Sequence, residues 1–147
     1  QEVTGTRTSG SYWKGDWHEG DRRPLGAAAH ETWLGSLVFD GARLFDGVAP
    51  DLDRHCARVN DSALALGLAP TLTGKEIEAL TFEGLKKFAP DTDVYIRPMY
   101  WAEESDVGVL PPKPETTDFA LCLEEMPMVP PAGFTITTTR FRRPTME

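Results

Sequence analysis

Two residues in an apolar stretch of the chain combine in a way that suits anion binding. Tyr95 and Arg97 lie two positions apart in the segment 94–102, whose β-branched and aromatic residues are typical of a strand. Residues at this spacing in a strand point to the same side. Arginine presents a planar fork of N–H donors that fits a carboxylate or a phosphate. An arginine paired with a structural acid across a sheet fits the spacing equally well.

A second candidate, Arg58, lies on a predicted helix over residues 51–66, with His55 one turn earlier. An apolar stripe at steps of four and three residues indicates this helix, and Arg58 lies off the stripe. The stripe consists of Leu52, Cys56, Val59, Ala63 and Leu66. Most arginines on a helix surface are simply solvated, so position alone favours a surface residue over a functional one.

The remaining pattern predicts the elements that must position these side chains. A second helix is expected over 75–88, because Thr73 and Glu76 have the spacing of a capping box. Strands are expected over 94–102, 119–125 and 134–141. Within 94–102, Pro98 suggests an edge strand or a bulge. The fold class is therefore α+β, an antiparallel sheet with two main helices on one face.

Two earlier segments are less regular. Residues 33–45 read as a strand or a strand–turn unit, with a helix as the alternative. Residues 1–30 are rich in Gly, Thr, Ser and charge, and they indicate a loosely structured amino-terminal arm. Trp13 and Trp17 are expected to dock this arm onto the rest of the protein.

Composition excludes several classes of function. The net charge of -8 argues against a general nucleic-acid binder, which needs a basic face. No apolar run is long enough to span a membrane and no signal peptide is recognisable, so a cytoplasmic protein is expected. Cys56 and Cys122 are expected to be free thiols. The three histidines form no metal-binding pattern with the cysteines.

Three blocks of sequence together resemble one family. Each block is similar to a conserved block of the branched-chain aminotransferases. The blocks are residues 94–99 (VYIRPM) with 107–112 (VGVLPP), residues 35–43 (GSLVFDGAR), and residues 55–63 (HCARVNDSA). These belong to the class IV (fold-type IV) enzymes that depend on pyridoxal 5'-phosphate. The resemblance covers roughly residues 25–147 and implies the small amino-terminal domain of that fold.

The resemblance implies roles for single residues. Arg58 matches the arginine that holds the cofactor phosphate, while Phe39, Tyr95 and Arg97 match positions that line the substrate pocket. Arg97 with Tyr95 would orient a substrate carboxylate, and Phe39 would cover an apolar side chain. Arg43 also matches a family arginine and is expected to be structural. Two departures, Leu34 for a common tyrosine and Asp40 for the commoner glutamate, bear on the substrate more than on the fold.

The catalytic lysine of the family has no match in this chain. Its five lysines fall on the second predicted helix or in loops: Lys14, Lys75, Lys86, Lys87 and Lys113. The resemblance therefore predicts that the Schiff-base lysine lies beyond residue 147, in a second, cofactor-binding domain. Residues 31–133 would form the small domain and residues 134–147 the start of the link. The chain by itself is expected to be inactive.

The expected reaction of the whole protein moves an amino group between a branched-chain or other apolar amino acid and a 2-oxo acid such as 2-oxoglutarate. A homodimer is implied, because family pockets borrow a loop from the neighbouring subunit. Three alternatives stay open on the same fold: a D-amino-acid or amine aminotransferase, an aminodeoxychorismate lyase, and a non-catalytic binding module.

Overall fold

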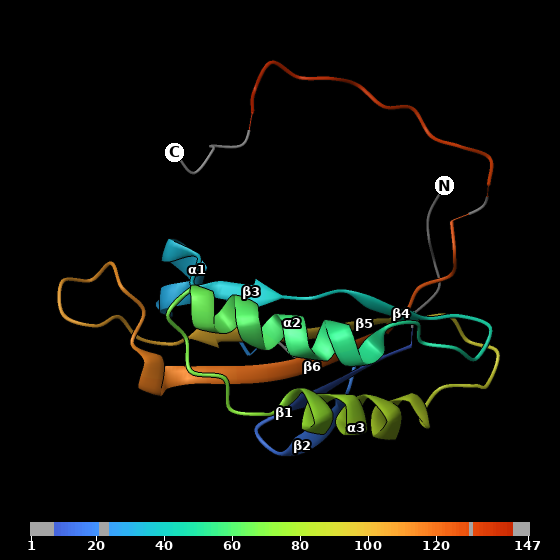
Figure 1. Ribbon diagram of the computed structural model, residues 1–147, viewed down its shortest axis with the longest axis horizontal. Helices are drawn as coiled ribbons and strands as arrows, with labels where there is room; N and C mark the ends of the chain where they lie inside the picture. Colours follow the sequence, from blue (N-terminus) through green and yellow to red (C-terminus); the bar gives the residue numbers. More distant parts are fainter. Residues whose placement is uncertain (1–7, 21–23, 130, 143–147) are drawn as a thin grey trace.

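A single antiparallel sheet organises the chain. The computed structural model describes residues 8–20, 24–129 and 131–142. Their strands pair in the order β2-β1-β6-β5-β3, and β4 also pairs with β5, beyond the end of β3 (Figure 1). The strands are β1 (Ser9–Trp13), β2 (Asp16–Glu19), β3 (Leu37–Phe39), β4 (Ala42–Leu44), β5 (Val94–Ala102) and β6 (Thr117–Glu125). The two long strands, β5 and β6, form the centre of the sheet.

Two helices, α2 (Leu52–Ala65) and α3 (Gly74–Leu85), pack on one face of this sheet (Figure 1). Between the helices and the sheet lies one hydrophobic core, to which Cys56 and Val59 of α2, Ile77 of α3 and Ile96 of β5 belong. A short helix α1 (His30–Leu34) precedes β3, and a 3-10 turn η1 (Pro114–Thr116) leads into β6. No helix in the described ranges is long and apolar enough to cross a membrane. The α+β expectation is confirmed.

The helix predictions hold to within a few residues. Asp51 is the N-cap residue of α2, and Gly67 just past its end has the positive φ of +81° that ends many helices. Thr73 and Glu76 form the predicted capping box at the start of α3. Their two reciprocal hydrogen bonds satisfy backbone amides that the first turn leaves without a partner. The second helix ends at Leu85, slightly earlier than predicted.

Alternation along β5 separates a buried face from an open face. Ile96 and Tyr100 are fully buried beneath the helices, whereas Tyr95, Arg97 and Met99 are half-buried on the opposite side. The edge-strand interpretation of Pro98 is wrong, because β5 has partners on both sides. The carbonyl of Pro98 accepts a hydrogen bond from the backbone N–H of Asp40 (3.1 Å). The nitrogen of Pro98, which carries no hydrogen, points to the same side as this carbonyl, toward the gap between β3 and β4. A proline is tolerated there because no ladder bond is lost.

The amino-terminal expectation needs correction. Residues 9–19 are not a loose arm, because β1 and β2 form a hairpin that extends the main sheet through β6. Residues 1–7 and 21–23 lie outside the described residues. The two indoles do attach this hairpin to the rest: Trp13 donates to Asp118 (2.9 Å) and Trp17 donates to Glu83 of α3 (3.1 Å). The polar composition of this segment gave no indication of strands, which form because β1 pairs with β6.

Two further segments differ from the sequence-based expectation. Residues 33 and 34 end helix α1, and the strand–turn unit begins only at β3. The strand predicted over 134–141 is wrong: its residues form no strand and pair with no described segment. The chain runs there away from the sheet, and Phe134, Ile136 and Phe141 are exposed (Figure 1). An alternating pattern becomes a strand only where a partner edge is available.

Candidate cofactor and substrate site

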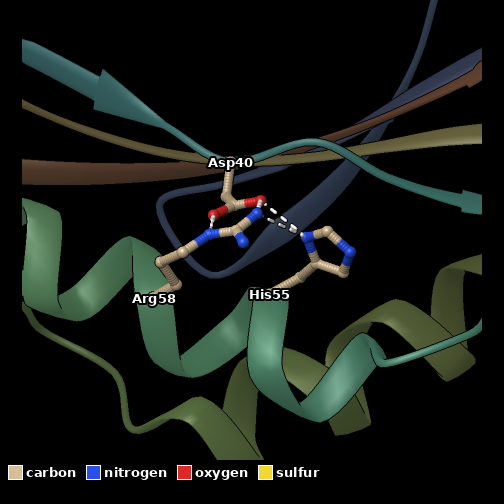
Figure 2. A network of polar contacts seen from close by, with 3 residues as sticks. All are labelled: Asp40, His55 and Arg58. Carbon is tan, nitrogen blue, oxygen red and sulfur yellow. Dashed lines mark hydrogen bonds and ion pairs between the residues drawn. The ribbon is translucent and has the colours of Figure 1, made fainter.

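Arg58 and Asp40 form a two-point ion pair between α2 and the β3–β4 connection. The Nε atom of Arg58 donates to Oδ2 of Asp40 (2.5 Å), and Nη2 donates to Oδ1 (2.8 Å), as Figure 2 shows. Helix α2 positions Arg58 one residue before buried Val59, so its side chain leaves the helix at the edge of the core. Asp40 follows β3 directly, and its backbone N–H is held by Pro98 of β5.

His55 is the third member of this cluster. Its Nδ1 lies 2.7 Å from Oδ1 of Asp40 and 3.0 Å from Nη2 of Arg58. The Asp40 carboxylate accepts, so Nδ1 carries the proton and donates to it, and the Arg58 nitrogen is close because both donors share one oxygen. Burial alone would raise the pKa of Asp40. The hydrogen bonds from Arg58 and His55 outweigh burial and lower that pKa below its ordinary value.

The cluster leaves part of the Arg58 guanidinium available for a ligand. The Asp40 side chain is only 6% exposed, whereas the Arg58 side chain is 62% exposed. In the described part of the chain no group accepts from Nη1 of Arg58, so both of its N–H donors remain available to a ligand. A guanidinium fixed along one edge and open along the other is suited to receive an anion.

The other predicted residues lie together on the open face of the sheet. Phe39 of β3 pairs with Met99 of β5, which places Phe39 on the same side as Tyr95 and Arg97. The Phe39 ring is 56% exposed. Arg97 lies over the Tyr95 ring at 5.7 Å, and its Nη2 atom lies 3.4 Å from the sulfur of Cys122 on β6. An aromatic wall beside a cation is thus built from two neighbouring strands.

The β3–β4 connection joins the two groups of residues. Phe39 points to the open face, Asp40 turns toward α2 and Arg58, and Gly41 lies against the hydroxyl of Tyr95. Arg58 therefore lies on the helix side of the β3–β4 connection, and the other three predicted residues lie on the open face of the sheet. Arg43 of β4 donates from Nη1 to the carbonyl of Met126 (2.6 Å), which agrees with a structural role.

Sequence reasoning missed the part that Asp40 plays. It named Asp40 as a departure from a family pattern and His55 as a neighbour of Arg58, without placing the three together. The signal was present in the one-turn spacing of His55 and Arg58, two donors that face the same direction. No pattern in the sequence said which acid would meet them. Across the described ranges, no three His, Cys, Asp or Glu side chains converge as a metal site requires.

Comparison with known families decides the class of protein. The family model described as amino-transferase class IV matches residues 37–146, which is most of the chain. This chain belongs to the class IV aminotransferase family. The match includes Phe39, Arg58, Tyr95 and Arg97 and confirms the resemblance noted above.

Curated relatives of this class IV chain are described as branched-chain aminotransferases. A probable branched-chain-amino-acid aminotransferase of Rickettsia bellii is 30% identical over 80% of this chain and 40% of the relative. A putative one of Methanocaldococcus jannaschii is 31% identical over 78% of this chain and 40% of the relative. The chain therefore spans less than half the length of the curated relatives it matches.

Solved structures agree on the fold of the class IV domain. An aminotransferase from Brucella abortus, bound to the cofactor PLP, is 72% identical with a TM-score of 0.90 over 94% of this chain and 49% of that chain. The branched-chain amino acid aminotransferase of Escherichia coli has a TM-score of 0.71 at 22% identity, over 86% of this chain and 42% of that chain. At that lower identity the likeness shows the fold alone.

Proposed function

We propose that this chain is the amino-terminal part of a pyridoxal-phosphate-dependent aminotransferase. The whole protein would move an amino group between a branched-chain or other apolar amino acid and a 2-oxo acid such as 2-oxoglutarate. One observation carries the proposal: 72% identity over 94% of the chain to an aminotransferase whose structure holds PLP. When bound, that cofactor supplies the electron-accepting ring that transamination requires.

Arg58 is the residue that would hold the cofactor phosphate. Its side chain is largely exposed, and no described residue accepts from its two Nη1 donors, so these donors can meet a phosphate oxygen. Asp40 already balances the charge of Arg58, so Arg58 contributes directed hydrogen bonds more than net positive charge. Further phosphate donors, the Schiff-base lysine and a carboxylate for the pyridine nitrogen would belong to a second domain of the protein.

The open face of the sheet would form one wall of the substrate pocket. Arg97 beside Tyr95 supplies a cation for the substrate carboxylate, and exposed Phe39 supplies apolar area for its side chain. The descriptions of the curated relatives favour a branched-chain amino acid over a D-amino acid or an amine. An aminodeoxychorismate lyase on the same fold is the alternative activity.

Several finer expectations belong to this proposal. Residues 31–133 would be the small domain and residues 134–147 the start of the link to the cofactor-binding domain. The exposed Phe134, Ile136 and Phe141 support this placement, because a linking segment needs a surface to cover its apolar side chains. A homodimer is proposed from the resemblance, and a cytoplasmic location from the sequence alone. Size-exclusion chromatography with light scattering tests the dimer.

The direct test uses the product of the whole gene. Purified protein is reduced with borohydride, which fixes the cofactor to its lysine, and the adduct is mapped by peptide mass. A pyridoxyl group on a lysine beyond residue 147 is expected, together with turnover of a branched-chain L-amino acid and 2-oxoglutarate. Turnover with a D-alanine donor instead would select the D-amino-acid alternative. Absence of any adduct would contradict the proposal.

Substitution of Arg97 tests the substrate wall separately from the cofactor. Arg97→Met should raise KM for the amino acid at least about tenfold, because it removes a charge-assisted bond to the carboxylate. The affinity for pyridoxal phosphate should not change. Arg54→Met, an exposed arginine on α2, is the matched control and should alter neither quantity. An unchanged KM in Arg97→Met would remove Arg97 from the pocket.

A further inference from the structure

We propose that Asp40 is a positioning residue, which orients the Arg58 guanidinium so that its Nη1 edge meets the cofactor phosphate. The inference rests on the proposed function and adds a residue that acts through Arg58 without touching the cofactor. On this proposal, Asp40 in the β3–β4 connection contributes to the affinity for pyridoxal phosphate.

The contact geometry fixes the plane of the guanidinium. Asp40 receives two parallel N–H bonds from Arg58, one from Nε and one from Nη2 (2.5 and 2.8 Å). A two-point contact of this kind restrains both the position and the rotation of the fork. Without it, a side chain that is 62% exposed would sample many rotamers, and a ligand would have to order it on binding.

Asp40 is itself held from three directions. Its backbone N–H donates to Pro98 of β5 (3.1 Å), and its carboxylate accepts from His55 as well as from Arg58 (Figure 2). Its side chain is 6% exposed, so it has little room to turn. The sheet, through Asp40, therefore fixes the orientation of the Arg58 side chain together with helix α2. A rigid support of this kind is what a preorganised binding site needs.

Arginine has five N–H donors, and Asp40 takes one from Nε and one from Nη2. The donors that remain include both of Nη1, for which no described residue is an acceptor, on a side chain that is 62% exposed. Asp40 thus selects which edge of Arg58 is offered. The cost of this arrangement is a carboxylate near the phosphate site, and the lowered pKa of Asp40 keeps that carboxylate ionised.

Two physical effects of Asp40 therefore oppose each other, and this makes the proposal testable. Positioning by Asp40 strengthens phosphate binding, whereas repulsion between its charge and the phosphate weakens it. Asp40→Asn keeps the size of the side chain and removes the charge. Weaker binding of the cofactor in this variant means that positioning dominates, and tighter binding means that repulsion dominates.

The experiment measures dissociation constants of the whole gene product, without its cofactor, for pyridoxal 5'-phosphate and for pyridoxal, which lacks the phosphate. Asp40→Asn should weaken pyridoxal phosphate binding on the order of tenfold and leave pyridoxal binding unchanged. Asp40→Glu, which restores the charge and both acceptors, should recover most of the loss. Asp61→Asn, an exposed acid one turn beyond Arg58 on α2, removes the same charge without that contact and should have no effect.

A double-mutant cycle with Arg58→Ala shows whether Asp40 acts through Arg58. In the Arg58→Ala background, Asp40→Asn should cost no further affinity, since the side chain that it positions is gone. A loss of the same size in both backgrounds would overturn the inference, as would unchanged or tighter binding in Asp40→Asn. If Asp40→Asn does not fold, His55→Gln serves instead. This variant should lose a smaller amount of affinity for pyridoxal phosphate and none for pyridoxal. Unchanged affinity for pyridoxal phosphate would overturn the inference.

The outcomes separate the two proposals. If the unsubstituted protein binds pyridoxal phosphate no better than pyridoxal, the proposed function and this inference both fail. If Arg58→Ala loses affinity for pyridoxal phosphate and Asp40→Asn does not, the proposed function stands and the positioning role of Asp40 fails.

Discussion

The hydroxyl of Tyr95 fills the space beside Gly41 that any larger residue at that position would need. A Cβ built on Gly41 overlaps this hydroxyl and lies 3.1 Å from the neighbouring ring carbon Cζ. The φ of Gly41 is not positive, so the position requires glycine for space and not for backbone conformation. Asp40 and Gly41 therefore serve opposite sides of the sheet: one holds Arg58 and the other admits Tyr95.

Gly41→Ala is expected to displace Tyr95 without unfolding the domain. The overlapping atom is the far end of a side chain on the half-open face, so the ring can shift and stability should change by less than about 1 kcal/mol. KM for the amino acid should rise several-fold, while the affinity for pyridoxal phosphate stays constant. Steady-state kinetics and cofactor titration measure both. In a Tyr95→Phe background the effect of Gly41→Ala should shrink; an equal effect would show that the overlap is not its cause.

Gly84 of α3 is expected to be far less tolerant. A Cβ at this position would overlap the ring of Trp17 and a methyl group of Leu123, both packed at the core. Gly84→Ala should destabilise the protein by about 1–3 kcal/mol, and the helix propensity of alanine offsets about 1 kcal/mol of this at most. Urea unfolding measures the change. Gly26→Ala, with nothing within 4 Å of the added Cβ, is the control. Equal stability of the two variants would show that the hairpin packs more loosely against α3.

The Asp40 ion pair predicts loss of stability in acid. The pKa of Asp40 in the folded protein lies below the ordinary value of 3.8, so its ionised form stabilises the fold. This contribution is complete above pH 3.8 and is lost as the pH falls through the lower, folded-state pKa. The difference in unfolding free energy between the unsubstituted protein and Asp40→Asn should thus be constant near neutral pH and shrink below about pH 4. A difference independent of pH would mean that the Asp40 charge contributes nothing.

Glu31 has the opposite behaviour. It is 6% exposed on α1, and no other described residue donates a hydrogen bond to its carboxylate. Burial, with repulsion from Glu103, raises its pKa above the ordinary value of 4.5, although its own backbone partly opposes this. Ionised Glu31 therefore destabilises the fold at neutral pH, and the cost disappears as the pH falls below 4.5, where both states are protonated.

Glu31→Gln should therefore raise the melting temperature near neutral pH, and the gain should vanish in acid. Calorimetry across the pH range measures it, with exposed Glu115→Gln as a control that should leave stability unchanged. A destabilised Glu31→Gln protein would reveal a partner for this carboxylate outside the residues described.

Local patterns in the sequence determined much of the fold. The apolar stripe of α2, the Thr73–Glu76 capping box of α3 and the alternation in β5 and β6 each depend on neighbours a few residues away. Such patterns act through helix and strand periodicity, so they are visible without the tertiary structure. The same alternation placed Tyr95 and Arg97 on one face before the sheet was known. The family blocks added Phe39 as a candidate and assigned Arg58 its expected role.

The tertiary structure decided what depends on partners distant in sequence. It paired the polar hairpin β1–β2 with β6 and left residues 134–141 without a strand partner, although their alternation was the clearer pattern. It also brought Asp40 to Arg58 and His55, across more than a dozen residues. Strand pairing and ion pairing both need a second surface, and no periodicity within a segment specifies which surface will meet it. The sequence could therefore nominate Arg58, while the fold alone revealed the acid that holds it in place.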